Sequence, residues 1–204
     1  MAGSVLSTKF HEAMKYAAEL HAKQVRKGTP IPYVAHLIAV ASLVLEHGGS
    51  EVEAIAGLLH DAIEDQGNDG RTRTEIGERF GADVLAIVAA CSDAEGQSGQ
   101  EKPPWKQRKL DYIAHVRKAG ASTCLVSAAD KLHNARAILG DLRVLGDKLW
   151  PRFSGGKDDS LWYYRSLVTE FRKADGSDGM KRLIDELDRT VTEIELLARI
   201  GGTS

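Results

Sequence analysis

Four ionisable side chains lie close together in an otherwise apolar stretch of the sequence, the segment 57–65 (GLLHDAIED). On a helix that turns about 100° per residue, one arc of roughly 140° holds His60, Asp61, Glu64 and Asp65. Three carboxylates on one face repel each other, and burial would drive them to take up protons. A divalent cation would stabilise the ionised carboxylates and a neutral imidazole together. The spacing therefore predicts a metal site on this face, with Gly57 in the middle of the arc leaving room for the ion.

Two further segments supply a histidine and an aspartate with apolar neighbours. His36 lies at the start of a predicted apolar helix, and Asp130 follows the apolar run 125–129 (LVSAA). An aspartate in so apolar a helix needs a partner, and a shared metal ion would provide one. Asn134 falls one turn after Asp130 and points to the same side. The candidate metal ligands are therefore His36, His60, Asp61 and Asp130.

Each of these residues taken alone has a simpler structural interpretation. His36 is then an ordinary histidine at a helix start, and Asp130 is an ion-pair partner of Arg136 or Lys131. The pair Glu64-Asp65 is then a solvated helix end. The joint pattern favours a metal site, because a histidine, a His-Asp pair and a distant aspartate within an apolar helix are specific together. The simpler interpretation is kept for the remaining histidines, which are His11, His21, His47, His115 and His133.

The elements that would position these residues are predicted to be helices almost throughout. Apolar residues recur at spacings of three and four, and no alternating run is bounded by hairpin turns. Two longer irregular segments, 93–104 and 151–159, are expected to be functional flaps or disordered insertions. The apolar stripe of the last helix suits packing against a bundle, and equally the seam of a homodimer. The predicted helices span 8–26, 35–47, 50–66, 72–80, 82–92, 104–119, 121–140, 158–173 and 178–199.

The composition bounds the class of protein. The chain has 204 residues, 43% hydrophobic and 27% charged, which is typical of a globular chain with one core. We therefore expect an all-α, single-domain helical bundle over 1–204, with a core at roughly 8–173 and a C-terminal packing helix at roughly 178–199. The net charge of -2 argues against a nucleic-acid partner. Cys91 and Cys124 lack metal or redox spacing, and neither a signal peptide nor a membrane span is apparent, which predicts a cytoplasmic protein with no membrane partner.

These motifs resemble those of a known family. The similar stretches are 26–27 (RK), 32–33 (PY) with His36, 60–65 (HDAIED) and 129–136 (ADKLHNAR). Together they resemble the hydrolase domain of RelA/SpoT proteins, within the HD superfamily of metal-dependent phosphohydrolases. The resemblance runs from about residue 10 to about residue 171, and stand-alone members of this group are called small alarmone hydrolases. It implies a helical bundle of the HD-domain type and Mn²⁺-dependent hydrolysis of the 3′-pyrophosphate of (p)ppGpp to GDP or GTP and pyrophosphate.

The resemblance also implies a role for each matching residue. Mn²⁺ would be bound by His36, His60, Asp61 and Asp130, and Zn²⁺, Co²⁺ or Fe²⁺ would also suit two nitrogen and two oxygen ligands. Glu64 and Asp65 would be the acidic pair that activates and orients the attacking water. Asp65 could instead protonate the leaving 3′ oxygen. The substrate would be bound by Arg26, Lys27, Lys106, Arg108 and Asn134, with Tyr163 or Tyr164 against the nucleotide.

Three departures from the family pattern bear on the substrate more than on the metal. Leu37 replaces the usual proline after the first metal histidine, the segment 27–33 is one residue longer, and the glycine-rich segment after Asp93 differs. One alternative is therefore an HD phosphohydrolase that acts on (p)ppApp, other nucleotides or NADPH. Another, from a different class, is a non-catalytic nucleotide-binding module. The pairs Glu64-Asp65 and Arg26-Lys27 favour the alarmone branch, and an intact set of ligands and acids favours an enzyme.

Overall fold

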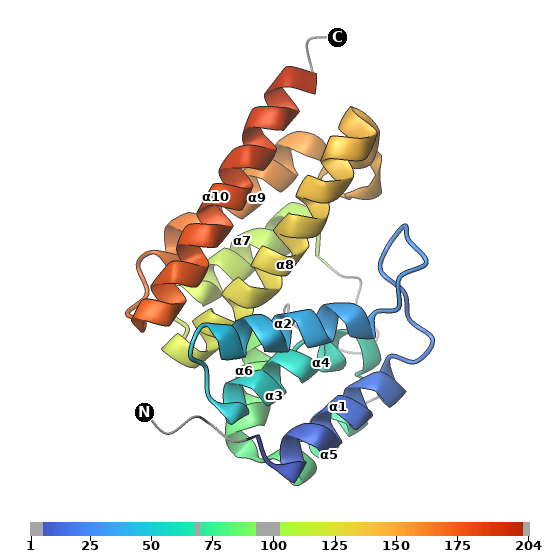
Figure 1. Ribbon diagram of the computed structural model, residues 1–204, viewed down its shortest axis with the longest axis vertical. Helices are drawn as coiled ribbons and strands as arrows, with labels where there is room; N and C mark the ends of the chain where they lie inside the picture. The colour runs from blue at the N-terminus through green and yellow to red at the C-terminus, as the bar shows by residue number, and fades with distance from the viewer. Residues whose placement is uncertain (1–5, 68–69, 93–102, 202–204) are drawn as a thin grey trace.

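The computed structural model describes residues 6–67, 70–92 and 103–201 (Figure 1). Over these ranges the chain forms helices and no β-strand, apart from an isolated antiparallel bridge between Val25 and Pro32. The predicted all-α, single-domain class is therefore confirmed. The helices are α1 (Thr8–Leu20), α2 (Val34–Glu46), α3 (Glu51–Leu59), α4 (Ala62–Gln66), α5 (Arg71–Phe80), α6 (Ala82–Cys91), α7 (Trp105–Val116), α8 (Ala121–Leu145), the 3-10 helix η2 (Gly146–Arg152), α9 (Gly156–Phe171) and α10 (Asp178–Gly201).

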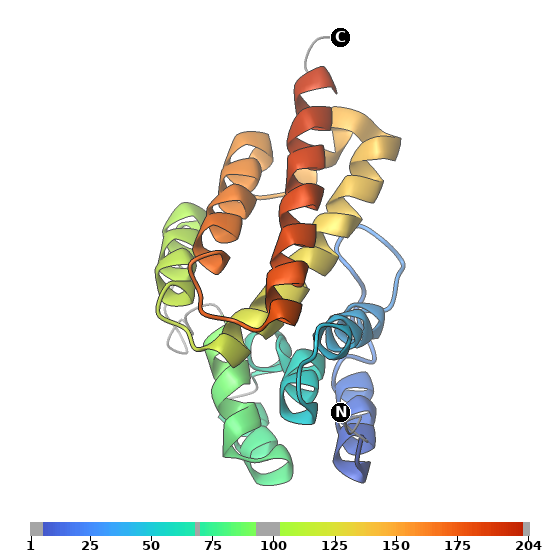
Figure 2. The same ribbon diagram turned by 60° about the vertical axis from the view of Figure 1, so that its left-hand side comes forward.

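Helix α8 is the central element of the bundle. It contacts α2, α3 and α6 near its beginning, and η2, α9 and α10 further along (Figure 1). Figure 2 shows α10 lying between α8 and α9, so that the C-terminal third of the chain covers one side of α8. No helix in the described part of the chain combines the length and apolar character that a membrane span requires. The bundle thus brings segments far apart in sequence against a single helix.

Two of the helices that carry the candidate ligands are buried along most of their length. Every residue of α3 from Ala54 to Leu59 is buried, and in α8 the run from Thr123 to Asp130 is buried as well. The beginning of α3 is set by a capping box, in which Ser50 and Glu53 each satisfy a backbone N–H of the other. Because burial fixes the position of both helices, His60, which follows α3, and Asp130, which lies within α8, are held by the core and not by flexible loops.

The predicted helix 50–66 is wrong in one respect that matters for the site: it is interrupted at His60 and Asp61. Helix α3 ends at Leu59 and α4 begins at Ala62. In an uninterrupted helix the carbonyl of Gly57 would accept from the N–H of Asp61. Here that carbonyl accepts from Nδ1 of His60 at 2.8 Å. The side chain of His60 therefore competes with the helix ladder at the break.

Gly57 does not leave room for an ion, contrary to the prediction. A Cβ added to Gly57 would lie 3.3 Å from Cα of Ala41 and 3.4 Å from its backbone nitrogen. The missing side chain instead lets α3 approach the backbone of α2 closely. Gly57 thus sets the distance between the two helices that carry the candidate histidines.

The first predicted helix, 8–26, is also too long, because α1 ends at Leu20. Residues 21–33 form a tight loop in which Arg26 N–H donates to the carbonyl of Ile31 at 2.8 Å and Tyr33 N–H donates to the carbonyl of Gln24 at 2.9 Å. Gly28 lies at the turn with φ of +76°, a conformation that other residues rarely adopt. The loop brings Arg26 and Tyr33 toward the site.

The irregular segment predicted at 151–159 is shorter than expected. Helix α8 extends to Leu145 and not to residue 140, η2 follows at once, and α9 begins at Gly156. Gly156 has φ of +60°, which allows the sharp change of direction into α9. Most of the other predicted irregular segment, 93–104, lies outside the described residues, because the structure describes only 103 and 104 of it.

Candidate metal centre and its cavity

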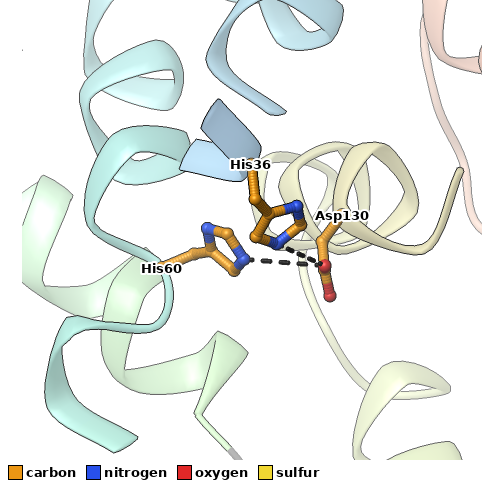
Figure 3. Close-up of side chains that lie close together, drawn as sticks. All are labelled: His36, His60 and Asp130. Carbon is orange, nitrogen blue, oxygen red and sulfur yellow. Dashed lines mark ion pairs between the residues drawn. The ribbon is translucent and has the colours of Figure 1, made fainter. Parts of the chain in front are cut away.

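Three buried side chains from different helices converge at one point (Figure 3). His36 comes from the first turn of α2, His60 from the break after α3, and Asp130 from α8. The distances from Oδ1 of Asp130 are 3.2 Å to Nε2 of His36 and 3.6 Å to Nε2 of His60. The three potential ligand atoms lie within 4.8 Å of one another. This spacing is what a single cation between them requires.

Asp61 lies beside this group. Its Oδ2 is 3.0 Å from Nε2 of His60 and 3.5 Å from Nε2 of His36. The break at His60 and Asp61 allows these neighbours in sequence to face the same point, which adjacent positions of a regular helix do not do. All four candidate ligands predicted from the sequence are thus brought together.

The two histidines have the hydrogen bonds that metal-binding imidazoles need. Nδ1 of His60 donates to the carbonyl of Gly57, and Nδ1 of His36 lies 2.7 Å from Nδ1 of His133. Nε2 of both His36 and His60 is buried and has no hydrogen-bond partner. A buried nitrogen without a partner is costly unless it binds something else. Two such atoms facing two carboxylates fit a divalent metal ion, as the donor set N₂O₂ also does.

The carboxylates of the cluster remain ionised despite their burial. Burial alone would raise the pKa of Asp130, but Lys131 and the two histidines hold that pKa well below its usual range. Lys131 forms an ion pair of 2.6 Å with Oδ2 of Asp130, leaving Oδ1 toward the histidines. Burial would likewise raise the pKa of Asp61, and His60 and His36 lower it. The ionised carboxylates present the charge that a cation would bind.

Residues around the cluster extend it into a hydrogen-bonded network. Asn134 donates from its amide nitrogen to Oδ1 of Asp130 and accepts from Arg26 through its oxygen at 2.6 Å. Tyr33 donates from its hydroxyl to Oδ2 of Asp61 at 2.6 Å. The prediction that Asn134 points to the same side as Asp130 is therefore confirmed.

The cluster opens onto a cavity of about 630 Å³ between the loop 26–33, α8 and η2. Its wall carries the positively charged Arg26, Lys27, Lys131 and Arg152 together with His36, Asp61 and Asp130. Apolar side chains, among them Ile31, Leu149 and Phe153, also line the cavity. A cavity with acidic ligands, several cations and apolar side chains suits an anionic ligand that also has a flat or apolar part.

The substrate-binding residues predicted from the sequence lie in two different places. Arg26, Lys27 and Asn134 line the cavity. Lys106 and Tyr163 lie between α7 and α9, where Lys106 pairs with Asp159 and Tyr163 is buried against Trp105. Tyr164 lines the cavity whereas Tyr163 does not, and Arg108, on α7, is half-buried and not part of the described lining.

The predicted acidic pair follows the break in the helix. Glu64 and Asp65 are both exposed, on α4, and neither is among the residues that line the cavity. Asp65 accepts a hydrogen bond from the amide of Gln24 at 2.6 Å. Gln24 in turn accepts from His21, whose Nδ1 lies 2.7 Å from the Gln24 oxygen. The loop after α1 therefore orients the Asp65 carboxylate through the side chain of Gln24.

Three residues at the site were not predicted as functional: Tyr33, Lys131 and His133. Each contacts a candidate ligand directly, through the bonds described above. Burial, followed by the charges of His36 and Arg26, lowers the pKa of His133 to about 4. The sequence holds a signal for His133, since three residues after Asp130 on a helix is a position on the same face.

Comparison with known proteins agrees with this geometry. Residues 13–144 match the HD domain, and the chain belongs to this family. The fruit-fly (Drosophila melanogaster) guanosine-3′,5′-bis(diphosphate) 3′-pyrophosphohydrolase MESH1 is 30% identical over 90% of this chain and 94% of its own length. A probable enzyme of the same name from Synechocystis is 29% identical over 62% of this chain, which spans only 16% of that longer protein.

Solved structures show the same relationship. One, described as a metazoan ortholog of SpoT that hydrolyses ppGpp and plays a role in starvation responses, has 29% sequence identity and a TM-score of 0.69, covering 90% of this chain and 95% of that one. The Listeria monocytogenes protein lmo0812 has 28% identity and a TM-score of 0.67, covering 81% and 99%. The chain is an HD-domain phosphohydrolase related to the MESH1 and SpoT ppGpp hydrolases, which confirms the family predicted from the motifs.

Proposed function

We propose that this protein hydrolyses the 3′-pyrophosphate of (p)ppGpp, releasing pyrophosphate and leaving GDP or GTP, with Mn²⁺ as its metal ion. The observation that carries the proposal is the pair of buried, unpartnered histidine nitrogens that face two ionised carboxylates beside a cavity lined by several basic side chains. The likeness to the fruit-fly enzyme supports the choice of substrate, since that protein is named for this reaction. A bound divalent ion would activate water and offset charge on the phosphoryl group.

In this proposal the side chains that bind the metal ion and the substrate form three groups. His36, His60, Asp61 and Asp130 hold the metal ion. Arg26, Lys27 and Asn134 bind the phosphates from the cavity wall, where charge-assisted hydrogen bonds to phosphate are strong. Lys106, Arg108 and Tyr163, which lie outside the described lining of the cavity, would complete the substrate site from α7 and α9.

Glu64 and Asp65 carry the proton transfers in the proposed reaction. The oxygen of water forms a new bond to the phosphorus attached to the 3′ oxygen, and the bond between that phosphorus and the 3′ oxygen breaks. Glu64 takes a proton from the water, and the departing 3′ oxygen gains one, from Asp65 or from solvent. The hydrogen bond from Gln24 supports this role, because it holds the Asp65 carboxylate in one orientation.

We further propose that residues 1–204 form a single HD hydrolase domain, with a core at roughly 8–173 and a packing helix at roughly 178–199. The packing of α10 against α8 and α9 supports this proposal. The HD match, which ends at residue 144, would then be completed by the helices that follow it.

The test of function is pyrophosphate release by chelator-stripped protein, with and without added Mn²⁺, from ppGpp, ppApp, GTP and NADPH in parallel. Asp61→Ala is expected to abolish release, and Asp111→Ala, an exposed aspartate on α7, serves as the matched control. Mn²⁺-dependent release from ppGpp that Asp61→Ala removes would support the proposal. Turnover of another compound but not of ppGpp would refute ppGpp as the substrate and leave the proposed metal site standing. Binding of a nucleotide without turnover of any of the four compounds would favour a non-catalytic module.

A further inference from the structure

His133 contacts a candidate metal ligand on one side and the cavity on the other. It lies on α8, three residues after Asp130 and therefore on the same face of the helix. Its Nδ1 is 2.7 Å from Nδ1 of His36, and the two rings have centroids 4.8 Å apart. The residue is half-buried and belongs to the wall of the cavity. Its remaining ring nitrogen, Nε2, is the polar atom that can serve a ligand there.

The contact between the two Nδ1 atoms, taken together with a metal ion bound to Nε2 of His36, would fix where the hydrogens lie. Two imidazole nitrogens at this distance form a hydrogen bond only if one carries the hydrogen and the other accepts it. Nε2 of His36 faces Oδ1 of Asp130 and Oδ2 of Asp61, and it must keep its lone pair free to bind a metal ion. The hydrogen of His36 is then on Nδ1.

His60 provides an internal comparison for this assignment. Its Nδ1 faces the carbonyl of Gly57 at 2.8 Å, and a carbonyl can only accept. His60 therefore carries a hydrogen on Nδ1, and with a metal ion bound it would present the lone pair of Nε2, as His36 would. The two candidate ligands differ in the acceptor, which is a backbone carbonyl for His60 and an imidazole for His36. Only the imidazole acceptor, His133, has a second nitrogen: when its Nδ1 accepts a hydrogen bond, the hydrogen of the neutral ring lies on Nε2.

We propose that His133 is a substrate-binding residue whose tautomer is set by the metal site: Nδ1 accepts from His36, and Nε2–H donates to a phosphoryl oxygen in the cavity. The proposal rests on the proposed function, since it takes the cluster to be a phosphohydrolase metal site. Arg26, Lys131 and Asn134 lie in the same wall. Beside the positively charged Arg26 and Lys131, a neutral donor adds a hydrogen bond to phosphate without adding another positive charge. Binding of metal and binding of phosphate are thereby coupled through one imidazole.

The tautomer can be measured directly. Protein with ¹⁵N-labelled histidine, loaded with diamagnetic Zn²⁺, is expected to show His133 as the Nε2–H tautomer with an unprotonated Nδ1. His36 and His60 are expected to show protonated Nδ1. Assignment uses His133→Asn to identify the missing signals, and exposed His115→Asn as the control. A hydrogen on Nδ1 of His133 in the loaded protein would overturn the proposal.

Two substitutions separate the functions of the two nitrogens. His133→Asn places an amide oxygen near the position of Nδ1 and nothing at Nε2, whereas His133→Gln places an amide nitrogen near Nε2 and nothing at Nδ1. With Zn²⁺ titrated into stripped protein by calorimetry, His133→Asn is expected to bind metal within about threefold of wild type, and His133→Gln to bind roughly tenfold or more weakly. When pyrophosphate is titrated into the Zn²⁺-loaded protein, the order of the two variants is expected to reverse. His133→Asn is then expected to bind pyrophosphate about tenfold more weakly than wild type.

These readouts do not depend on which nucleotide is hydrolysed. Suppose that ppGpp is not a substrate, but that the tautomer of His133 and the opposite effects of the two variants on metal and pyrophosphate affinity are as expected. The proposed function then fails and the role of His133 stands. If ppGpp is hydrolysed and both variants bind metal and pyrophosphate like wild type, the role of His133 fails and the function stands. Wild-type protein that binds metal but no pyrophosphate would also overturn the role of His133 as a phosphoryl donor.

Discussion

The hydroxyl of Tyr33 donates to Oδ2 of Asp61 at 2.6 Å, and the same oxygen lies 3.0 Å from Nε2 of His60. Tyr33 precedes α2 directly and comes from the loop that follows α1, whereas Asp61 lies at the break between α3 and α4. The bond therefore joins two segments that meet only in the folded protein. It also holds the most exposed of the four candidate ligands, whose side chain is 21% exposed, against the buried cluster.

Replacing Tyr33 with phenylalanine is expected to weaken metal binding about tenfold, because the orientation of Asp61 is no longer held by a hydrogen bond. The ring, which stacks on His21, is retained, so the fold should be unchanged. Calorimetric titration with Mn²⁺ measures the affinity, and circular dichroism checks the fold. Tyr16→Phe is the control, since its hydroxyl bonds to Glu75 on α5. Equal metal affinity of Tyr33→Phe and wild type would contradict the positioning role.

Replacing Gln24 with leucine is expected to lower kcat by about tenfold or more while metal affinity stays the same, because Asp65 loses the amide that orients it. His21 also loses the acceptor of its Nδ1–H in this variant. Steady-state kinetics on the proposed substrate, beside a metal titration, separates the effect on kcat from an effect on metal affinity. The exposed Gln107→Leu on α7 is a control of the same chemistry. A parallel fall in metal affinity would show that Gln24 acts on the whole site and not on Asp65.

Replacing Gly57 with alanine is expected to destabilise the protein by about 1–3 kcal/mol, since the new Cβ would press on the backbone of Ala41 and push α2 and α3 apart. Urea unfolding measures the change. Gly140→Ala on α8 is the control, because a Cβ there meets nothing within 4 Å and alanine is the better helix former. If Gly57 instead made room for the ion, alanine would reduce metal affinity and leave stability unchanged.

The ion pairs of Glu170 make a prediction about acid stability. Arg117 and Lys173 donate to this buried carboxylate and lower its pKa to about 2. A lowered folded-state pKa contributes stability that is fully present above the unfolded pKa near 4.5 and is lost as pH falls toward 2. Glu170→Gln is expected to be less stable than wild type by about 1–2 kcal/mol at pH 7, a modest figure because the basic partners are exposed.

Denaturant unfolding at several pH values, with the exposed Glu12→Gln on α1 as control, measures this difference. The difference in free energy of unfolding between wild type and Glu170→Gln should decrease below about pH 4.5. A difference in free energy of unfolding that stays constant down to pH 2.5 would mean that the charge of the Glu170 carboxylate does not stabilise the folded protein.

Local spacing was enough to predict the helical class and which residues would gather at the site, whereas the family was predicted from the resemblance of the motifs. The pattern of apolar residues determines helices, and a histidine, a His-Asp pair and an aspartate in apolar surroundings are costly to bury without a shared partner. The predicted ligands His36, His60, Asp61 and Asp130 do meet in space. The roles of Glu64, Asp65 and the substrate-binding residues stay predictions.

Tertiary structure decided what the residues face. At the break, the side chain of His60 bonds to the carbonyl of Gly57, a side-chain contact that helical periodicity does not include. Gly57 faces the backbone of Ala41, and His133 faces His36, because α2 packs against α3 and α8 at particular distances and angles. A sequence pattern sets the direction of a side chain within its own helix, whereas the neighbour in that direction depends on the packing of helices remote in the chain.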